Sequence, residues 1–208
     1  GHGSDDALAE IRASTDLDAL ARRCHDDVLA IVHEAALRLV GLGEPGQRRL
    51  AWLLAGELLP LHFDAITASL PLWSEGDALD AVRFGLSRGH GGPELRFRVA
   101  IALGERGEDR IEEAITAVLE PSTERWLRVS DPDRLLERAP DARALARRLL
   151  LSPHAAAYRR AASMLLAGEL GPDDLAALRA FLGLGDDRMR ELRIEVARRL
   201  SELGDPTG

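Results

Sequence analysis

The stretch CHDD at 24–27 combines a thiol, an imidazole and two carboxylates, which are the side chains that zinc prefers as ligands. His33 lies eight residues after His25, whereas two ligands on one helix face need a separation of four residues, as in H-E-x-x-H. Cys24 has no histidine and aspartate placed in the sequence to activate it as a nucleophile. We therefore expect a solvated surface here, and the sequence predicts no metal, no cofactor and no catalytic residue.

The glycine-rich segment 87–93 (SRGHGGP) resembles a phosphate-binding loop only in its glycines. Such loops follow a strand and open a helix, and no strand is predicted before this segment. Glycine lowers the cost of irregular backbone, so we interpret 87–93 as a linker and the position of a possible hinge.

Pairs of adjacent arginines could bind the phosphates of a nucleic acid, and five occur: Arg22-Arg23, Arg48-Arg49, Arg147-Arg148, Arg159-Arg160 and Arg198-Arg199. Phosphate binding depends on clustered positive charge, whereas the chain has a net charge of −8. Residues 1–89 hold 8 arginines and 14 acids, and the remainder holds 19 arginines and 21 acids. Neither part is basic, so nucleic acid is not the predicted partner.

The segment 121–134 (PSTERWLRVSDPDR) is the candidate binding surface. Trp126 stands between Arg125 and Arg128, and tryptophan and arginine are enriched in the hot spots of protein interfaces. We predict that these three residues contact a partner. The alternative is that Trp126 fills a groove between helices.

The other two tryptophans are interpreted from their neighbours. Trp73 lies at a turn in LPLWSEGD and is a second candidate for partner binding, with the same alternative of a buried position. Trp52 is flanked by leucines in LAWLL, and we predict that it belongs to the core.

The apolar residues recur with a helical period throughout the chain, and no alternating run of the strand type occurs. The segment 93–107 (PELRFRVAIALGERG) is apolar or small almost all the way round its helix, so this helix must be buried on several sides. The sequence therefore predicts an all-α fold. The expected helices are 5–13, 16–23, 26–41, 46–59, 61–70, 76–88, 94–105, 108–119, 122–129, 132–138, 141–151, 154–168, 173–182 and 187–202.

An Ala-x-x-Leu pattern near a helix end, followed by glycine and an acid or proline, recurs at irregular spacing. It occurs in ALRLVGLGEPG, AWLLAGELLP, AIALGERGED, AASMLLAGELGPDD and ARRLSELGDP. The chain resembles the HEAT-repeat family over about residues 93–205 and more weakly before them. The segments that carry the resemblance are PELRFRVAIALGERGEDRIEEAITAVLE, YRRAASMLLAGELGPDDLAALRAFL and RELRIEVARRLSELGDP. The resemblance implies a right-handed α-solenoid of antiparallel helix pairs with irregular repeats. We expect one elongated domain over 5–205, after a tag remnant at 1–4.

Binding of a protein or peptide along the concave face of a solenoid is the non-catalytic function that this resemblance implies. One branch of HEAT-like proteins, the alkylpurine DNA glycosylases, supplies an enzyme alternative, and a helical domain that binds a small molecule is a third. All 27 basic residues are arginine, which indicates a GC-rich, bacterial genome. One cysteine, no signal peptide and no apolar run of about 20 residues favour a cytoplasmic protein that does not span a membrane. The oligomeric state is left open.

Overall fold

The computed structural model describes residues 2–56, 58–185 and 188–204, and these residues form thirteen α-helices and three short 3-10 helices without any strand. The all-α fold predicted from the sequence is confirmed for this part of the chain. Within the same ranges no helix has both the length and the apolar composition needed to cross a bilayer.

The chain forms two compact units, Gly1–Glu113 and Ala114–Gly208. Their charges differ: the first holds 12 arginines and 20 acids, and the second holds 15 of each. The whole net charge of −8 therefore belongs to the first unit. A single domain over 5–205 and a hinge at 87–93 stay predictions.

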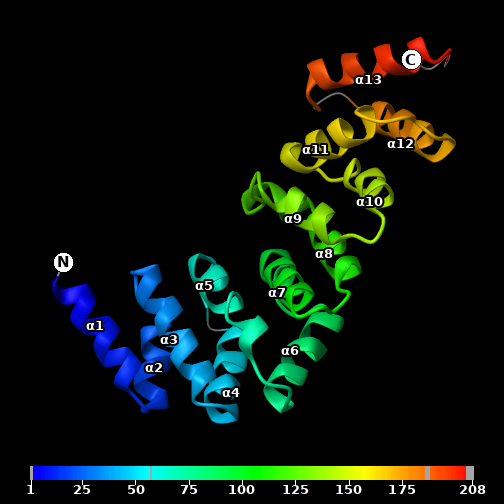
Figure 1. The fold of residues 1–208 in the computed structure, drawn as a ribbon. Helices are drawn as coiled ribbons and strands as arrows, with labels where there is room; N and C mark the ends of the chain where they lie inside the picture. Colours follow the sequence, from blue (N-terminus) through cyan, green and yellow to red (C-terminus); the bar gives the residue numbers. More distant parts are fainter. Residues whose placement is uncertain (1, 57, 186–187, 205–208) are drawn as a thin grey trace. The chain divides into compact units, whose positions relative to one another are not determined.

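In the first unit the helices pack in two rows (Figure 1). One row runs through α1 (His2–Ala13), α3 (Leu29–Gly41), α5 (Phe63–Thr67) and α7 (Pro93–Glu105), each in contact with the next. The other row runs through α2 (Leu17–Arg23), α4 (Glu44–Leu54) and α6 (Asp77–Ser87). Two 3-10 helices, η1 (Pro60–His62) and η2 (Leu70–Leu72), flank α5, and α8 (Ile111–Val118) begins in this unit.

The second unit repeats this order of contacts. After η3 (Pro121–Arg125) come α9 (Asp131–Arg138), α10 (Ala142–Leu149), α11 (Ala155–Leu166), α12 (Pro172–Gly183) and α13 (Arg190–Glu202). Here α9, α11 and α13 contact in succession, and α10 contacts both α11 and α12. In both units a helix thus packs mainly against the next helix and the one after it.

Helix α7 is buried on several sides, as its composition predicts. Phe97 and Leu103 are completely buried, and α7 packs against α5, η2 and α6. Arg98 also lies inside with only 2% of its surface exposed, and its Nε atom is 3.4 Å from a carboxylate oxygen of Asp64. A buried guanidinium needs such a carboxylate, because removing a charge from water without compensation is very costly.

Gly46 explains how closely α4 approaches α3. A Cβ atom at this position would coincide with the carbonyl group of Leu39, so no other residue fits without moving the backbone. Next to it, buried Gln47 donates from Nε2 to the carbonyl oxygen of Val40 at 3.2 Å, and its Oε1 accepts from the hydroxyl of Ser74 at 3.0 Å.

In the second unit, the carboxylate of Asp174 joins α10 to α12. Its oxygens accept from Arg143 and Arg147, at 2.8 Å each, and from the backbone N–H of Gly171 at 3.0 Å. Burial alone would raise the pKa of Asp174, but these donors bring the pKa down to about 2. The carboxylate therefore stays ionised at neutral pH and holds the first turn of α12 against α10.

Several predicted helix boundaries differ from those of the structure. The helix expected over 46–59 ends at Leu54, and the one expected over 61–70 is divided into η1 and α5. The segment 121–125 forms a 3-10 helix where an α-helix over 122–129 was expected. Pro60 and Pro121 begin the two 3-10 helices η1 and η3, and the residue before a proline is biased away from the helical region; the end of α4 at Leu54 has no proline beside it.

Candidate functional site

Trp52 on α4 is 72% exposed, so its predicted place in the core is wrong. The buried stripe of α4 contains Gly46, Leu50 and Leu53. At about 100° per residue, Trp52 points roughly opposite to this stripe. The flanking leucines suggested a core position, whereas the helical period counted from Gly46 places Trp52 outside.

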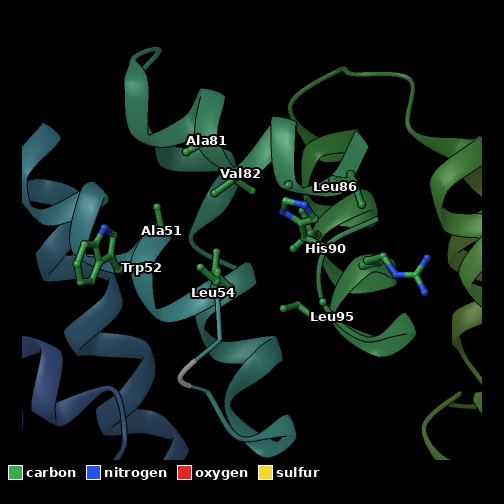
Figure 2. A pocket seen from close by; sticks show the side chains of 13 residues that line it. Ala51, Trp52, Leu54, Ala81, Val82, Leu86, His90 and Leu95 are labelled. Carbon is green, nitrogen blue, oxygen red and sulfur yellow. The ribbon is translucent and has the colours of Figure 1, made fainter. Parts of the chain in front are cut away.

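Beside Trp52 lies a cavity of about 310 Å³, which we call the apolar cavity. Helices α4, α6 and α7 and the turn at 90–91 line it with Ala51, Trp52, Leu54, Ala55, Ala81, Val82, Gly85, Leu86, His90, Gly91, Leu95, Arg96 and Val99. In Figure 2, Leu54 and Val82 lie in the middle of this lining, between Trp52 on one side and His90 on the other. A volume of this size is at the lower end of the range found for ligand pockets.

On the other side of Trp52 lies a second hollow, of about 250 Å³, between α2 and α4. We call it the charged hollow, because it is lined by Asp18, Ala21, Arg22, His25, Arg49, Trp52 and Leu53. Asp18 pairs with Arg49 across this hollow. Trp52 thus separates an apolar cavity from a charged hollow, and we call the three together the Trp52 face.

The turn after α6 brings His90 to the cavity. Gly89 and Gly91 have φ angles of 71° and 84°, which non-glycine residues rarely adopt. This backbone lets the N–H of His90 donate to the carbonyl of Gly85 at 2.8 Å, so the chain folds back over the end of α6. The glycines of 87–93 therefore position an imidazole at the rim of the cavity.

Two further side chains continue from His90 outside the lining of the cavity. The ring of Phe84, which is 57% exposed, meets the ring of His90 edge-on at a centroid distance of 6.2 Å. The guanidinium of Arg88 lies 5.1 Å from the centre of the Phe84 ring, within the range of a cation–π contact. The surface next to the cavity thus combines an aromatic ring with a cation.

Helix α6, which forms one wall of the cavity, is held at its beginning by α4. A carboxylate oxygen of Glu44 accepts from the backbone N–H of Ala78 at 2.9 Å, in the first turn of α6. A carboxylate is favourable there, because the N-terminus of a helix carries a partial positive charge. The two helices that flank the cavity are thereby connected directly.

An ion-pair network holds the opposite side of α6. Arg83 donates to Glu75 at 2.7 Å and to Glu108 at 3.0 Å. Hydrogen bonds from Arg83 and Arg106 lower the pKa of Glu75 to about 2. Burial by itself would raise the pKa of Glu108, but hydrogen bonds from Arg83 and Arg110 lower it below the ordinary value. Because these carboxylates stay ionised at neutral pH, α6 is fixed to the end of α7.

Of the residues predicted to bind a partner, three lie together in the second unit. Trp126 is half-buried at the end of η3, between Arg125 and Arg128, which are both exposed. The backbone N–H of Arg128 donates to Asp131 at 2.8 Å, which helps to fix the segment. Their role in binding stays a prediction.

Trp73 is only 2% exposed, so of its two interpretations the structure shows the buried one. Its indole N–H donates to the hydroxyl of Ser69 at 3.1 Å, and its carbonyl oxygen accepts from Arg106 at 2.6 Å. Arg106 also donates to the carbonyls of Leu70 and Pro71, so one guanidinium gathers the carbonyls at the end of η2. This corrects the placement of Trp73 at a binding surface.

The stretch 24–27 is less solvated than predicted. Cys24 is completely buried, and burial raises the pKa of its thiol to about 12, so the thiol is neutral and a poor nucleophile. Sequence reasoning missed His62, which lies inside, donates from Nε2 to the carbonyl of Asp26 at 3.0 Å and contacts the ring of His25. In the described ranges, no three His, Cys, Asp or Glu side chains are grouped to hold a metal ion.

Comparison with protein-family models, with curated proteins and with solved structures finds no match. The residues themselves therefore carry the functional interpretation. They define an all-helical protein with an exposed tryptophan between two hollows of different chemistry.

Proposed function

We propose that this protein is a non-catalytic binding protein, and that a protein or peptide partner docks on the Trp52 face of the first unit. The observation that carries the proposal is the 72% exposure of Trp52 between the two hollows. Tryptophan is one of the residues most enriched in interface hot spots, and such residues typically lie beside pockets that the partner fills.

A HEAT-like α-solenoid is part of this proposal. It is supported by contacts that join most helices to one or both of the next two and by the close approach of α3 and α4 at Gly46. Repeat proteins of this kind contact only neighbouring repeats and use the surface of one row of helices for binding. In the first unit, the Trp52 face lies on the row of α2, α4 and α6. A cytoplasmic location also belongs to the proposal.

The proposal is tested with the full-length chain as bait in a lysate of the source organism. A true partner is captured by the wild-type chain and its yield falls at least about tenfold with Trp52→Ala, because truncating a hot-spot tryptophan costs about 2 kcal/mol or more. Trp126→Ala is the matched control, since it removes the tryptophan of the surface predicted from the sequence. Equal capture by wild type and Trp52→Ala would contradict the proposal, and a loss with Trp126→Ala alone would favour the surface at 125–128.

A small molecule in the apolar cavity is the second candidate function. The volume of about 310 Å³ and the apolar lining with His90 at its rim favour it. Native mass spectrometry of the protein purified from its source would detect a bound compound. Leu86→Trp, which fills the cavity, should abolish that binding but reduce capture of a protein partner only in part.

The DNA glycosylase alternative gains no support from the charges. The first unit has a net charge of −8 and the second a net charge of zero. Binding to duplex DNA instead depends on clustered cationic side chains, which displace the counterions of the phosphates. Nucleic acid is accordingly not the partner that we propose.

A further inference from the structure

The Trp52 face is basic although the unit that carries it is acidic. Among the residues that the structure describes, the ionisable ones that line its two hollows are Arg22, His25, Arg49, His90 and Arg96, with Asp18 as the one acid. Asp18 is already paired with Arg49. Counted without the histidines, the lining holds three arginines and one acid, whereas the first unit as a whole holds 12 arginines and 20 acids, so the formal charge of the lining is opposite in sign to that of the unit.

Two exposed arginines, Arg22 in this face and Arg88 just outside its lining, are available to an incoming anion. Arg22 in the charged hollow is exposed, and among residues 2–56, 58–185 and 188–204 no carboxylate pairs with it. Arg88, beside the apolar cavity, contacts the Phe84 ring and likewise has no carboxylate partner within those ranges. A guanidinium presents several donors in a planar fork and binds carboxylates well.

The spacing of the two hollows constrains what can occupy both. The charged hollow lies between α2 and α4, and the apolar cavity lies on the other side of α4, against α6 and α7. Neighbouring helix axes are about 8–10 Å apart, so the hollows are separated by roughly that distance. A helical ligand covers about 10 Å in seven residues, and an extended ligand covers it in three.

We propose that the occupant of the Trp52 face is an acidic amphipathic segment of a partner protein. A large apolar side chain of this segment enters the apolar cavity and packs against Trp52. An aspartate or glutamate, seven residues away in a helix or three in an extended chain, enters the charged hollow and pairs with Arg22. This inference rests on the proposed function and adds the chemistry of the partner.

The acidic residues around the Trp52 face add to the specificity for this binding position. An acidic segment is attracted by Arg22 and Arg88 but is repelled elsewhere on the first unit, so charge favours this register over others. A single-stranded nucleic acid could also stack on Trp52, but its continuous phosphates would meet the net negative charge of the unit. A peptide with one or two carboxylates beside an apolar anchor avoids that repulsion.

The test is a selection of random 16-residue peptides, displayed on phage, against the full-length chain. We expect the enriched peptides to share an apolar residue with an acid at the spacing of seven or three residues. Synthetic copies of these peptides should bind at least about tenfold more weakly to Trp52→Ala and to Arg22→Glu, and more weakly at high salt. Arg190→Glu is the matched control, because Arg190 is also exposed, lies on the second unit and belongs to no candidate binding surface.

Every other outcome overturns the inference, and the outcomes separate it from the proposed function. Enriched peptides that depend on Trp52 but lack an acid, or that bind Arg22→Glu normally, would leave the proposed function standing and remove the acidic partner. The absence of any Trp52-dependent peptide would remove both. Displacement of the peptides by a 16-nucleotide single strand, or self-association that Trp52→Ala abolishes, would assign the face to nucleic acid or to a second copy of this chain.

Discussion

Replacing Trp52 and Trp73 separately by alanine should have opposite consequences. Trp52 is 72% exposed, so only about a quarter of its roughly 200 Å² is buried, which stabilises the fold by at most about 1.4 kcal/mol at ~25 cal/mol per Å². Trp73 is 2% exposed, and truncating a buried tryptophan costs about 3–5 kcal/mol. The same substitution should therefore reduce the stability of the fold little at position 52 and strongly at position 73.

Thermal unfolding followed by circular dichroism measures the difference. A unit of this length has an unfolding entropy of about 0.24 kcal/mol/K, so Trp52→Ala should lower the Tm of the first unit by no more than about 6 °C and Trp73→Ala by about 13–21 °C. Iodide quenching of tryptophan fluorescence gives an independent check, since Trp52→Phe should remove most of the quenchable emission. Equal losses of Tm in the two alanine variants, or quenching that is as strong in Trp52→Phe as in the wild type, would refute the exposed position of Trp52 and the binding face built on it.

Three further predictions concern packing and charge. Gly46→Ala should destabilise the first unit by about 1–3 kcal/mol, as measured by urea unfolding, because the added methyl group meets the backbone of α3. Gly41→Ala is the control and should be nearly neutral, because the space around Gly41 is open. Asp174→Asn should destabilise the second unit by about 2 kcal/mol, whereas Asp173→Asn, at an exposed position, should not. The pKa of Asp174 is about 2 in the folded protein against an ordinary 3.8, so its stabilising contribution is present above pH 3.8 and is lost as the pH falls toward 2. A series of Tm values measured at different pH would show this loss. Cys24 should react with a thiol reagent at neutral pH only as fast as the first unit opens, and rapid modification of the native protein would contradict its burial.

The helices could be predicted from the sequence because their signals are local. The apolar residues of 93–107 surround the helix on most sides, and this predicts the burial of α7 without knowledge of its neighbours. The same reasoning would have placed Trp52 outside if the helical period had been counted from Gly46 instead of from the adjacent leucines. That error came from the interpretation and not from a missing signal.

The candidate site depends on contacts that no local pattern contains. The charged hollow joins residues of α2 to Arg49, more than twenty residues further on, and the apolar cavity requires the turn at Gly89 and Gly91 to return His90 to α6. Trp73 is buried in a segment whose carbonyls accept from Arg106, a residue that follows α7. Contacts between residues far apart in the sequence depend on tertiary packing. For this reason the sequence analysis predicted the surface at 125–128 and did not predict the Trp52 face.

The order of helix contacts has a consequence for how the chain acquires its structure. Since the main contacts of a helix reach only the next two helices, few residues must wait for a distant part of the chain before they can pack. Topologies with such local contacts lose little loop entropy on the way to the native state and belong to the fast-folding proteins. Each helix can therefore dock as it leaves the ribosome, and the first unit can assemble its buried Cys24, its ion pairs and its exposed Trp52 while the second is still being made.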